Sequence, residues 1–277
     1  MNKQRLFSRS LLIILILGLS TSPSFGKIHH LKIPSVALTD SNRIIVTTPD
    51  NFDVNKESGY PFIAMLHGWS GDETQWEDDA DLQSLSNRYN ILLVLPDGGY
   101  DGWWLDTDLV PGRNYASHIQ QEIKIWMVLH FNGSPKASQQ GIMGLSMGGF
   151  GAFVQALEHP GDYAAAASLS GVMDITRHQD GWGLIDVLGS FSGNRDNWEA
   201  HNPLHLAQKP APSHGPALLL ICGDDDFAFP ENQAMAHQMK SLGYSARFQV
   251  EEGAHTHTFW KAHVGEAIDF IVSNFQK

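Results

Sequence analysis

A glycine-rich segment near the middle of the chain holds the residue best suited to covalent chemistry. Ser146 lies in residues 144–149, G-L-S-M-G-G, between an apolar stretch at 140–143 and small and apolar residues at 150–157. A serine with a glycine two residues away on each side, between a strand and a helix, is typical of a nucleophile elbow, where a strained turn exposes the hydroxyl. We therefore predict that Ser146 is a nucleophile and that the backbone N–H of Met147 faces a developing oxyanion.

A serine hydroxyl is a weak nucleophile, so it needs a base to accept its proton and an acidic group to orient that base. The acid candidates are the three aspartates at 224–226, which follow the apolar segment 217–222. The base candidates are His255 and His257, which follow the strand-like segment 247–250. The chain order serine, acid, histidine fits a triad on a parallel sheet. His255 is favoured because it is the first histidine after a glycine, whereas the choice among the aspartates stays open.

A second oxyanion donor is expected in the loop that follows an earlier strand. The apolar segment 61–66 is followed by His67, Gly68 and Trp69, so the backbone N–H of Trp69 is the predicted donor. We interpret His67 as structural because it precedes the glycine of this loop.

Metal and cofactor sites are not indicated by the sequence. The chain has 14 histidines, but it has no H-E-x-x-H motif and no cysteine–histidine spacing of the zinc type. No G-x-G-x-x-G motif follows a strand pattern. The single cysteine, Cys222, lies in an apolar segment, so we expect it in the core and predict no intramolecular disulfide.

Strand-like and helix-like patterns alternate along the chain, which predicts an α/β fold with a mostly parallel central sheet covered by helices on both faces. The expected strands are 36–39, 43–48, 61–66, 91–95, 140–143, 163–169, 217–222 and 247–250, the first two forming an antiparallel hairpin around 40–42. The clearest expected helices are 79–89, 115–130, 150–157 and a closing helix through 260–271. Residues 172–213 lack a clear strand, and we interpret them as a small insertion on the catalytic side. In such sheets the site lies at the carboxyl ends of the strands.

The first 26 residues resemble a targeting segment. Lys3, Arg5 and Arg9 precede an apolar run at 11–19 that is too short to span a bilayer, and small residues near Gly26 suit a signal peptidase. We predict that 1–26 is a signal peptide and that 27–277 forms one domain, exported to the periplasm or the medium. Retention of the segment as a membrane anchor is the alternative.

The charge balance limits the class of partner. The chain carries a formal charge of −12, which argues against nucleic acid or an anionic membrane as a partner. No second hydrophobic run follows the N-terminal one, so no stable membrane insertion is expected after cleavage. A small molecule is the expected partner, and the sequence does not indicate the oligomeric state.

Several segments together resemble the esterase D family of α/β-hydrolases, which includes S-formylglutathione hydrolases, tributyrin esterases, feruloyl esterases and mycolyltransferases. The segments that carry the resemblance are 65–71 with Trp76, 102–108, 144–149, 222–227 and 253–255 with Trp260. Residues 102–108 look most like the tributyrin esterases. The resemblance implies an α/β-hydrolase fold, Ser146 as nucleophile, Asp226 as triad acid and His255 as base. It also implies that Trp69 and Met147 supply the oxyanion donors.

The expected function is that of an exported serine carboxylesterase, which hydrolyses short-chain acyl or small aryl esters through an acyl-enzyme on Ser146. Trp103, Trp104, Phe227 and His257 are the predicted substrate-pocket residues. Residues 256–258, Thr-His-Thr, depart from the family pattern, since related esterases often carry bulky aromatic residues there. The alternatives are a feruloyl or acetyl esterase acting on plant polysaccharide, an acyltransferase of the same family and a catalytically silent binding protein.

Overall fold

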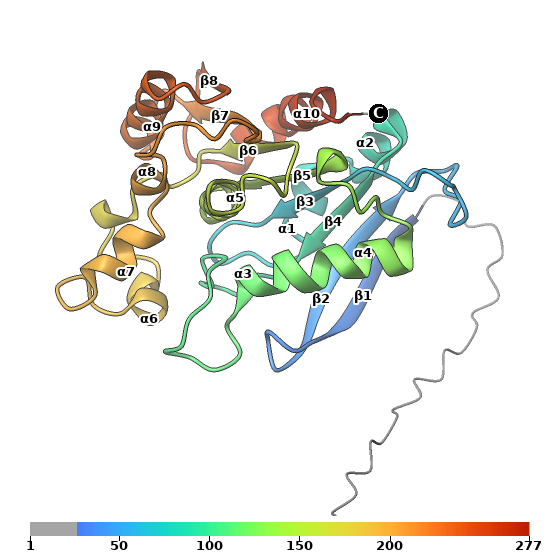
Figure 1. The fold of residues 1–277 in the computed structure, drawn as a ribbon, viewed down its shortest axis with the longest axis horizontal. Helices are drawn as coiled ribbons and strands as arrows, with labels where there is room; N and C mark the ends of the chain where they lie inside the picture. Colours follow the sequence, from blue (N-terminus) through green and yellow to red (C-terminus); the bar gives the residue numbers. More distant parts are fainter. Residues whose placement is uncertain (1–26, 277) are drawn as a thin grey trace, which may run out of the picture.

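The computed structural model describes residues 27–276, which form an eight-stranded sheet with the order β1-β2-β4-β3-β5-β6-β7-β8 (Figure 1). The strands are β1 (Lys27–Ser35), β2 (Asp40–Thr48), β3 (Phe62–Leu66), β4 (Leu92–Pro96), β5 (Gln140–Leu145), β6 (Ala165–Leu169), β7 (Ala217–Gly223) and β8 (Ala246–Glu251). β2 runs antiparallel to its neighbours β1 and β4, and β3 to β8 pair in parallel. The predicted mostly parallel sheet is therefore confirmed.

Helices cover both faces of this sheet, and a separate hydrophobic cluster lies beneath each set. One face carries α3 (Tyr115–Ser117), the π-helical η1 (His118–Ile123), α4 (Lys124–Phe131), α5 (Met147–Glu158) and α9 (Phe229–Ser241). The other carries α1 (Gln75–Asp79), α2 (Leu82–Tyr89) and α10 (His257–Ser273). Because both faces are covered, the central strands are buried along their whole length, and nearly all of their residues are apolar.

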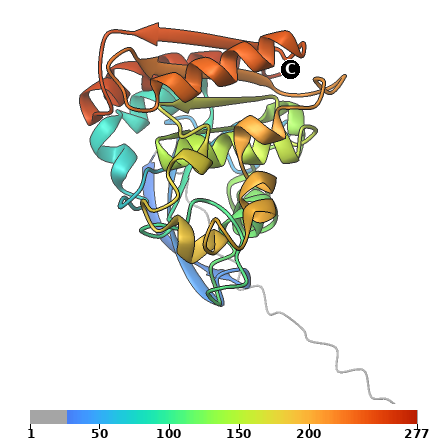
Figure 2. The ribbon, with the colours of Figure 1, turned by 90° about the vertical axis from the view of Figure 1, so that its left-hand side faces the viewer.

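The predicted insertion at 172–213 contains only short helices. These are η3 (Ile175–Arg177), α6 (Leu184–Leu188), α7 (Arg195–Ala200) and α8 (Pro203–Leu206). They appear in yellow and orange, gathered beside α5 (Figures 1 and 2). A further short helix, η2 (Ala137–Gln139), precedes β5.

The predicted first hairpin is wrong in its position. Residues 36–39 form the turn between β1 and β2, not a strand, and Ser35 pairs with Asp40 across it. The side chain of Val36 is exposed, so the local apolar alternation is misleading. The turn is fixed from elsewhere in the chain, because the carboxylate of Glu122 accepts the N–H groups of Val36 and Ala37.

Two predicted helices differ from the structure in a way that concerns the site. The expected helix 79–89 begins later, as α2 at Leu82, whereas Asp79 ends the separate helix α1 and Ala80 after it is extended. The expected helix 115–130 is continuous but contains the π-helical segment η1. The predicted signal peptide at 1–26 lies outside the described residues. Within 27–276, no helix has both the length and the apolar character that a membrane span requires.

Candidate active site

Ser146 lies in a strained turn between β5 and α5. Its backbone has φ 51° and ψ −118°, a conformation that residues other than glycine rarely adopt. The close packing explains the glycines of this segment. A Cβ on Gly144 would lie 2.2 Å from the carbonyl carbon of Gly148, and one on Gly148 would lie 2.1 Å from the carbonyl oxygen of Leu66. The turn thus exists only because both positions lack side chains.

His255 lies between Ser146 and a buried aspartate. His255 Nε2 is 2.8 Å from Ser146 Oγ, and His255 Nδ1 is 3.0 Å from each carboxylate oxygen of Asp226. The Asp226 side chain is fully buried, and its Oδ1 also accepts the N–H of Ala228 at 2.8 Å. The neighbouring aspartates 224 and 225 are exposed. The structure therefore brings together one of the three candidate acids and one of the two candidate bases.

Two backbone N–H groups lie beside this serine without a partner. The N–H groups of Trp69 and Met147 donate to no atom of residues 27–276. Met147 is the first residue of α5, so its N–H has no acceptor within the helix. The loop that contains Trp69 is held by Gln75, whose Oε1 accepts the N–H of Gly68 at 2.7 Å. Both N–H groups are therefore free to donate to a bound group.

The serine opens into a cavity of about 190 Å³ whose lining is mainly aromatic. The large side chains in this lining are Trp69, Trp103, Trp182, Phe227, His255, His257 and Trp260. Trp182 belongs to the 172–213 insertion and was not among the predicted pocket residues. Its carbonyl accepts Trp103 Nε1 and its ring lies 5.3 Å from that of Phe227. Nothing in the sequence near Trp182 distinguishes it from the other tryptophans of the loops.

Trp104 does not line the cavity, contrary to its predicted role. Its side chain is fully buried, and its Nε1 donates to the carbonyl of His67 at 3.1 Å. The ring packs so closely that a Cβ on Gly98 would lie 2.5 Å from Trp104 Cζ2. Trp103 and Trp104 both have positive φ, but only Trp103 lines the cavity. Trp104 supports the loop of Trp69 from below.

Residues 35–269 match the model of the family described as "Putative esterase". The chain belongs to this esterase family. The predicted resemblance to the esterases is thereby confirmed, and so is the assignment of the chain as a serine hydrolase that acts on carboxylic esters.

Similar proteins of known sequence or structure agree with this membership. An acetyl esterase from Caldicellulosiruptor saccharolyticus is 25% identical over 230 residues, which cover 79% of this chain and 85% of that protein. The fluorophosphonate-binding serine hydrolase FphF of Staphylococcus aureus is 22% identical with a TM-score of 0.78, covering 90% of this chain and 99% of that one. The S-formylglutathione hydrolase FrmB of Staphylococcus aureus, also 22% identical, has a TM-score of 0.77 and covers 90% of this chain and 100% of that one. The likeness confirms the α/β-hydrolase fold.

In this esterase, His67 supports the site without lining its cavity. Its Nε2 accepts the N–H of Gly98 at 2.7 Å, so the proton lies on Nδ1, which donates to the carbonyl of Gly68 at 2.8 Å. Asp97 lies next to this imidazole, with a carboxylate oxygen 3.7 Å from His67 Nε2. Burial opposes ionisation of Asp97, but hydrogen bonds from Arg43 and from the N–H of Gly99 outweigh it, and the pKa of the carboxyl is lowered to about 2.

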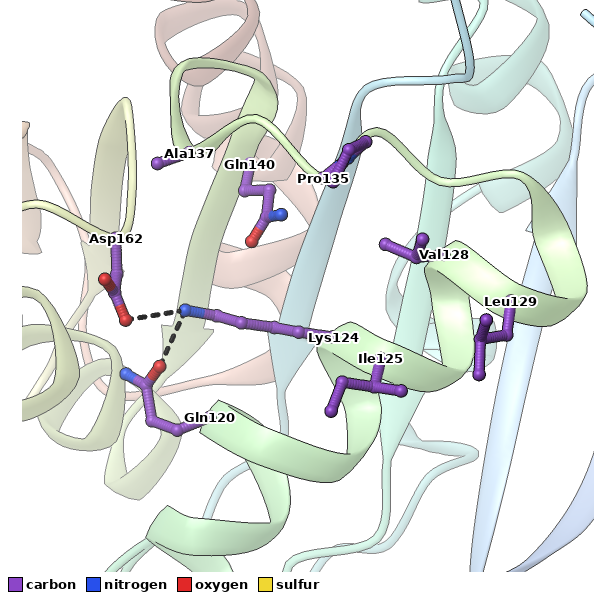
Figure 3. Close-up of a pocket in the computed structure, with 9 residues that line it drawn as sticks. All are labelled: Gln120, Lys124, Ile125, Val128, Leu129, Pro135, Ala137, Gln140 and Asp162. Atoms are coloured by element: carbon purple, nitrogen blue, oxygen red, sulfur yellow. Dashed lines mark hydrogen bonds and ion pairs between the residues drawn. The ribbon is translucent and has the colours of Figure 1, made fainter.

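Another cavity, of about 390 Å³, lies between η1 and α4 on one side and residues 135–140 and Asp162 on the other. Lys124 extends across it, and its Nζ donates to Gln120 Oε1 at 2.6 Å and pairs with Asp162 Oδ2 at 3.1 Å (Figure 3). Much of the remaining wall is apolar and includes Ile125 and Leu129. Within the part of the chain that the structure describes, no three His, Cys, Asp or Glu side chains gather to hold a metal ion.

Proposed function

We propose that this protein is an exported serine carboxylesterase that hydrolyses short-chain acyl or small aryl esters. The observation that carries the proposal is the line of hydrogen bonds from Ser146 Oγ through His255 to buried Asp226, beside two backbone N–H groups without partners. This set contains a nucleophile, a base, an orienting acid and an oxyanion site, which are the parts that acyl transfer requires.

The geometry supports a two-step mechanism. His255 Nε2 accepts the proton of Ser146 as Oγ attacks the ester carbonyl, and the N–H groups of Met147 and Trp69 stabilise the resulting oxyanion. His255 then donates the proton to the leaving alcohol oxygen, and an acyl-enzyme remains on Ser146. Water, activated by His255, attacks this acyl group and releases the acid. Asp226 holds His255 with its proton on Nδ1 and stabilises the imidazolium that forms.

The cavity supports small substrates. Its volume of about 190 Å³ is below the range of roughly 300–1,000 Å³ that is typical of sites for drug-sized ligands. Rings of Trp103, Trp182 and Phe227 form much of its wall, and such surfaces favour an apolar acyl chain or a flat aromatic group. The acetyl esterase relative favours acetyl esters within this substrate class.

Export is proposed on the sequence pattern of residues 1–26. Expression of the full chain in a bacterial host, followed by fractionation and mass spectrometry of the N-terminus, tests this part. We expect a product that begins near residue 27 outside the cytoplasm, and an intact N-terminus in the membrane fraction would contradict cleavage.

The enzymatic proposal is tested with p-nitrophenyl acetate, butyrate, octanoate and ferulate, assayed with residues 27–277 beside the Ser146→Ala variant. We expect rates that fall with acyl length, a loss on the order of 10⁴-fold or more in kcat for the variant, and an unchanged melting temperature. A fluorophosphonate probe should label the wild type and not the variant. Wild-type rates in Ser146→Ala would refute the mechanism, and a marked preference for ferulate would refute the short-chain assignment.

A further inference from the structure

His257 and Asp79 form a second histidine–carboxylate pair at the rim of the active-site cavity. His257 Nδ1 lies 2.8 Å from Asp79 Oδ2 and 3.1 Å from Oδ1. The Asp79 side chain, at the end of α1, is only 4% exposed, whereas that of His257, at the start of α10, is 63% exposed and lines the cavity. Within residues 27–276, no other group forms a hydrogen bond to the Asp79 carboxylate. Asp79 therefore serves to orient His257.

The contact with Asp79 determines what the other ring nitrogen can do. A carboxylate only accepts hydrogen bonds, so the neutral imidazole carries its proton on Nδ1. Nε2 is then an acceptor, directed away from Asp79, and it has no partner among the described residues. An oriented acceptor at the rim of a cavity is complementary to a hydrogen-bond donor on the substrate.

His257 lies on the side from which the alcohol departs. In the mechanism above, His255 protonates the leaving oxygen, so the alcohol portion of the ester must lie next to His255. His255 and His257 pack against the same ring, that of Trp260, with centroid distances of 5.0 and 5.1 Å. Gln75 of α1, which also holds the loop of Trp69, lines the same cavity. Helix α1 thus positions both the oxyanion loop and the acceptor of His257.

We infer that His257 Nε2 accepts a hydrogen bond from a hydroxyl group on the alcohol portion of the ester, so that the enzyme prefers esters of polyols over esters of simple alkyl alcohols. The inference rests on the proposed esterase function. His257 is a specificity-determining residue in this account. Its hydrogen bond forms during acylation and is absent from the hydrolysis of the acyl-enzyme, because the alcohol has left by then.

A matched pair of substrates tests the inference, namely propyl acetate and 2,3-dihydroxypropyl acetate, which share the acyl group and differ only in hydroxyls on the alcohol. For the wild type we expect kcat/KM to be about 3- to 10-fold higher for the hydroxylated ester, as one hydrogen bond provides. In His257→Phe the ratio should fall to about 1. Asp79→Asn removes the charge that fixes the tautomer of His257, so its ratio should lie between that of the wild type and 1. All rates are divided by the concentration of active sites, measured by titration with a fluorophosphonate, so unfolded protein does not affect the rate constants.

His263→Phe is the matched control. His263 is also on α10 and also pairs through Nδ1 with a carboxylate, Glu266 Oε2 at 2.9 Å, but it does not line the cavity. Its variant should keep the wild-type ratio. A wild-type ratio of 1 or less, or a wild-type ratio that survives His257→Phe, would overturn the inference. Turnover of p-nitrophenyl acetate in the same preparation would show that the esterase proposal survives that failure.

Discussion

Two of the cavities of this esterase, the active-site cavity and the cavity beside α4, differ in a way that size does not explain. The cavity beside α4 is about twice as large, roughly 390 against 190 Å³. Its main polar group, Lys124, is already paired with Gln120 and Asp162, and its Nζ lies 4.1 Å from the centroid of the Tyr163 ring. The smaller cavity contains a serine in a strained turn, a histidine aligned with it and two N–H groups without partners.

The difference between the two cavities shows where in the fold polar groups remain available to react with a substrate. The active-site cavity lies at the carboxyl ends of parallel strands, where β5, β7 and β8 each deliver a polar residue into one place and α5 begins. The cavity beside α4 borders Gln140 at the start of β5, at the opposite end of that strand from Ser146. Its polar groups satisfy one another. In the active-site cavity some polar groups have no hydrogen-bond partner in the protein, so a substrate can form hydrogen bonds with them.

The largest effect after removal of Ser146 is expected from Asp226→Asn. An asparagine in this position donates to Nδ1 of His255 and favours the tautomer whose Nε2 cannot accept the serine proton. We predict a loss of about 10³- to 10⁴-fold in kcat for p-nitrophenyl acetate at pH 7, with a melting temperature close to that of the wild type.

Asp225→Asn is the control for this variant, because Asp225 is adjacent in sequence but exposed. Its kcat should stay within about twofold of the wild type. Equal losses in Asp225→Asn and Asp226→Asn would mean that loop charge, not orientation of His255, supports the reaction.

Asp97→Asn should affect stability in a pH-dependent manner. The folded protein lowers the pKa of this carboxyl from 3.8 to about 2, so ionised Asp97 stabilises the folded state above pH 3.8. After allowance for solvent screening, the variant should lose about 1–2 kcal/mol of unfolding free energy at pH 7. The difference should shrink as the pH falls from about 4 towards 2, which urea denaturation at a series of pH values measures. A difference that grows on acidification would contradict this assignment.

Lys124→Met should have the smallest effect and tests the α4 cavity. Burial lowers the pKa of Lys124, although contact with Asp162 opposes the shift, so the charged ammonium is disfavoured in the folded state. We predict unchanged esterase activity and a gain of less than about 1 kcal/mol in unfolding free energy at pH 7. The difference in unfolding free energy between variant and wild type should shrink as the pH rises towards 10. In this pH range the folded wild type binds fewer protons than the unfolded chain, so its stability rises with pH. A several-fold loss of activity would mean that the two cavities are coupled.

The parts of the site that follow from neighbouring residues could be predicted from the sequence. The glycines around Ser146 predict the elbow because each removes a clash within two residues of the serine or with the adjacent strand. The alternation of apolar segments with helical patterns predicts the parallel sheet, and it places His255 after the last strand. Such signals are local, so a single sequence contains them in full.

Other features depend on contacts between distant segments. Residue spacing alone did not decide which of the three aspartates at 224–226 is the triad acid. The resemblance to known esterases singled out Asp226. In the structure, the loop after β7 brings the Asp226 carboxylate to His255. Trp103 and Trp104 looked equivalent as pocket residues, yet only Trp103 lines the cavity, and Trp182 enters the wall from the insertion.

By itself, the sequence determined that the chain forms a mostly parallel sheet with Ser146 in a strained turn and a histidine after the last strand. Only the tertiary structure decided the partners of those groups. The pairing of His257 with Asp79 joins residues 178 positions apart, and it depends on the break between α1 and α2 and on the packing of α1 against α10. The physical reason is that backbone strain and apolar periodicity act over a few residues, whereas the position of a buried carboxylate depends on how whole elements pack together.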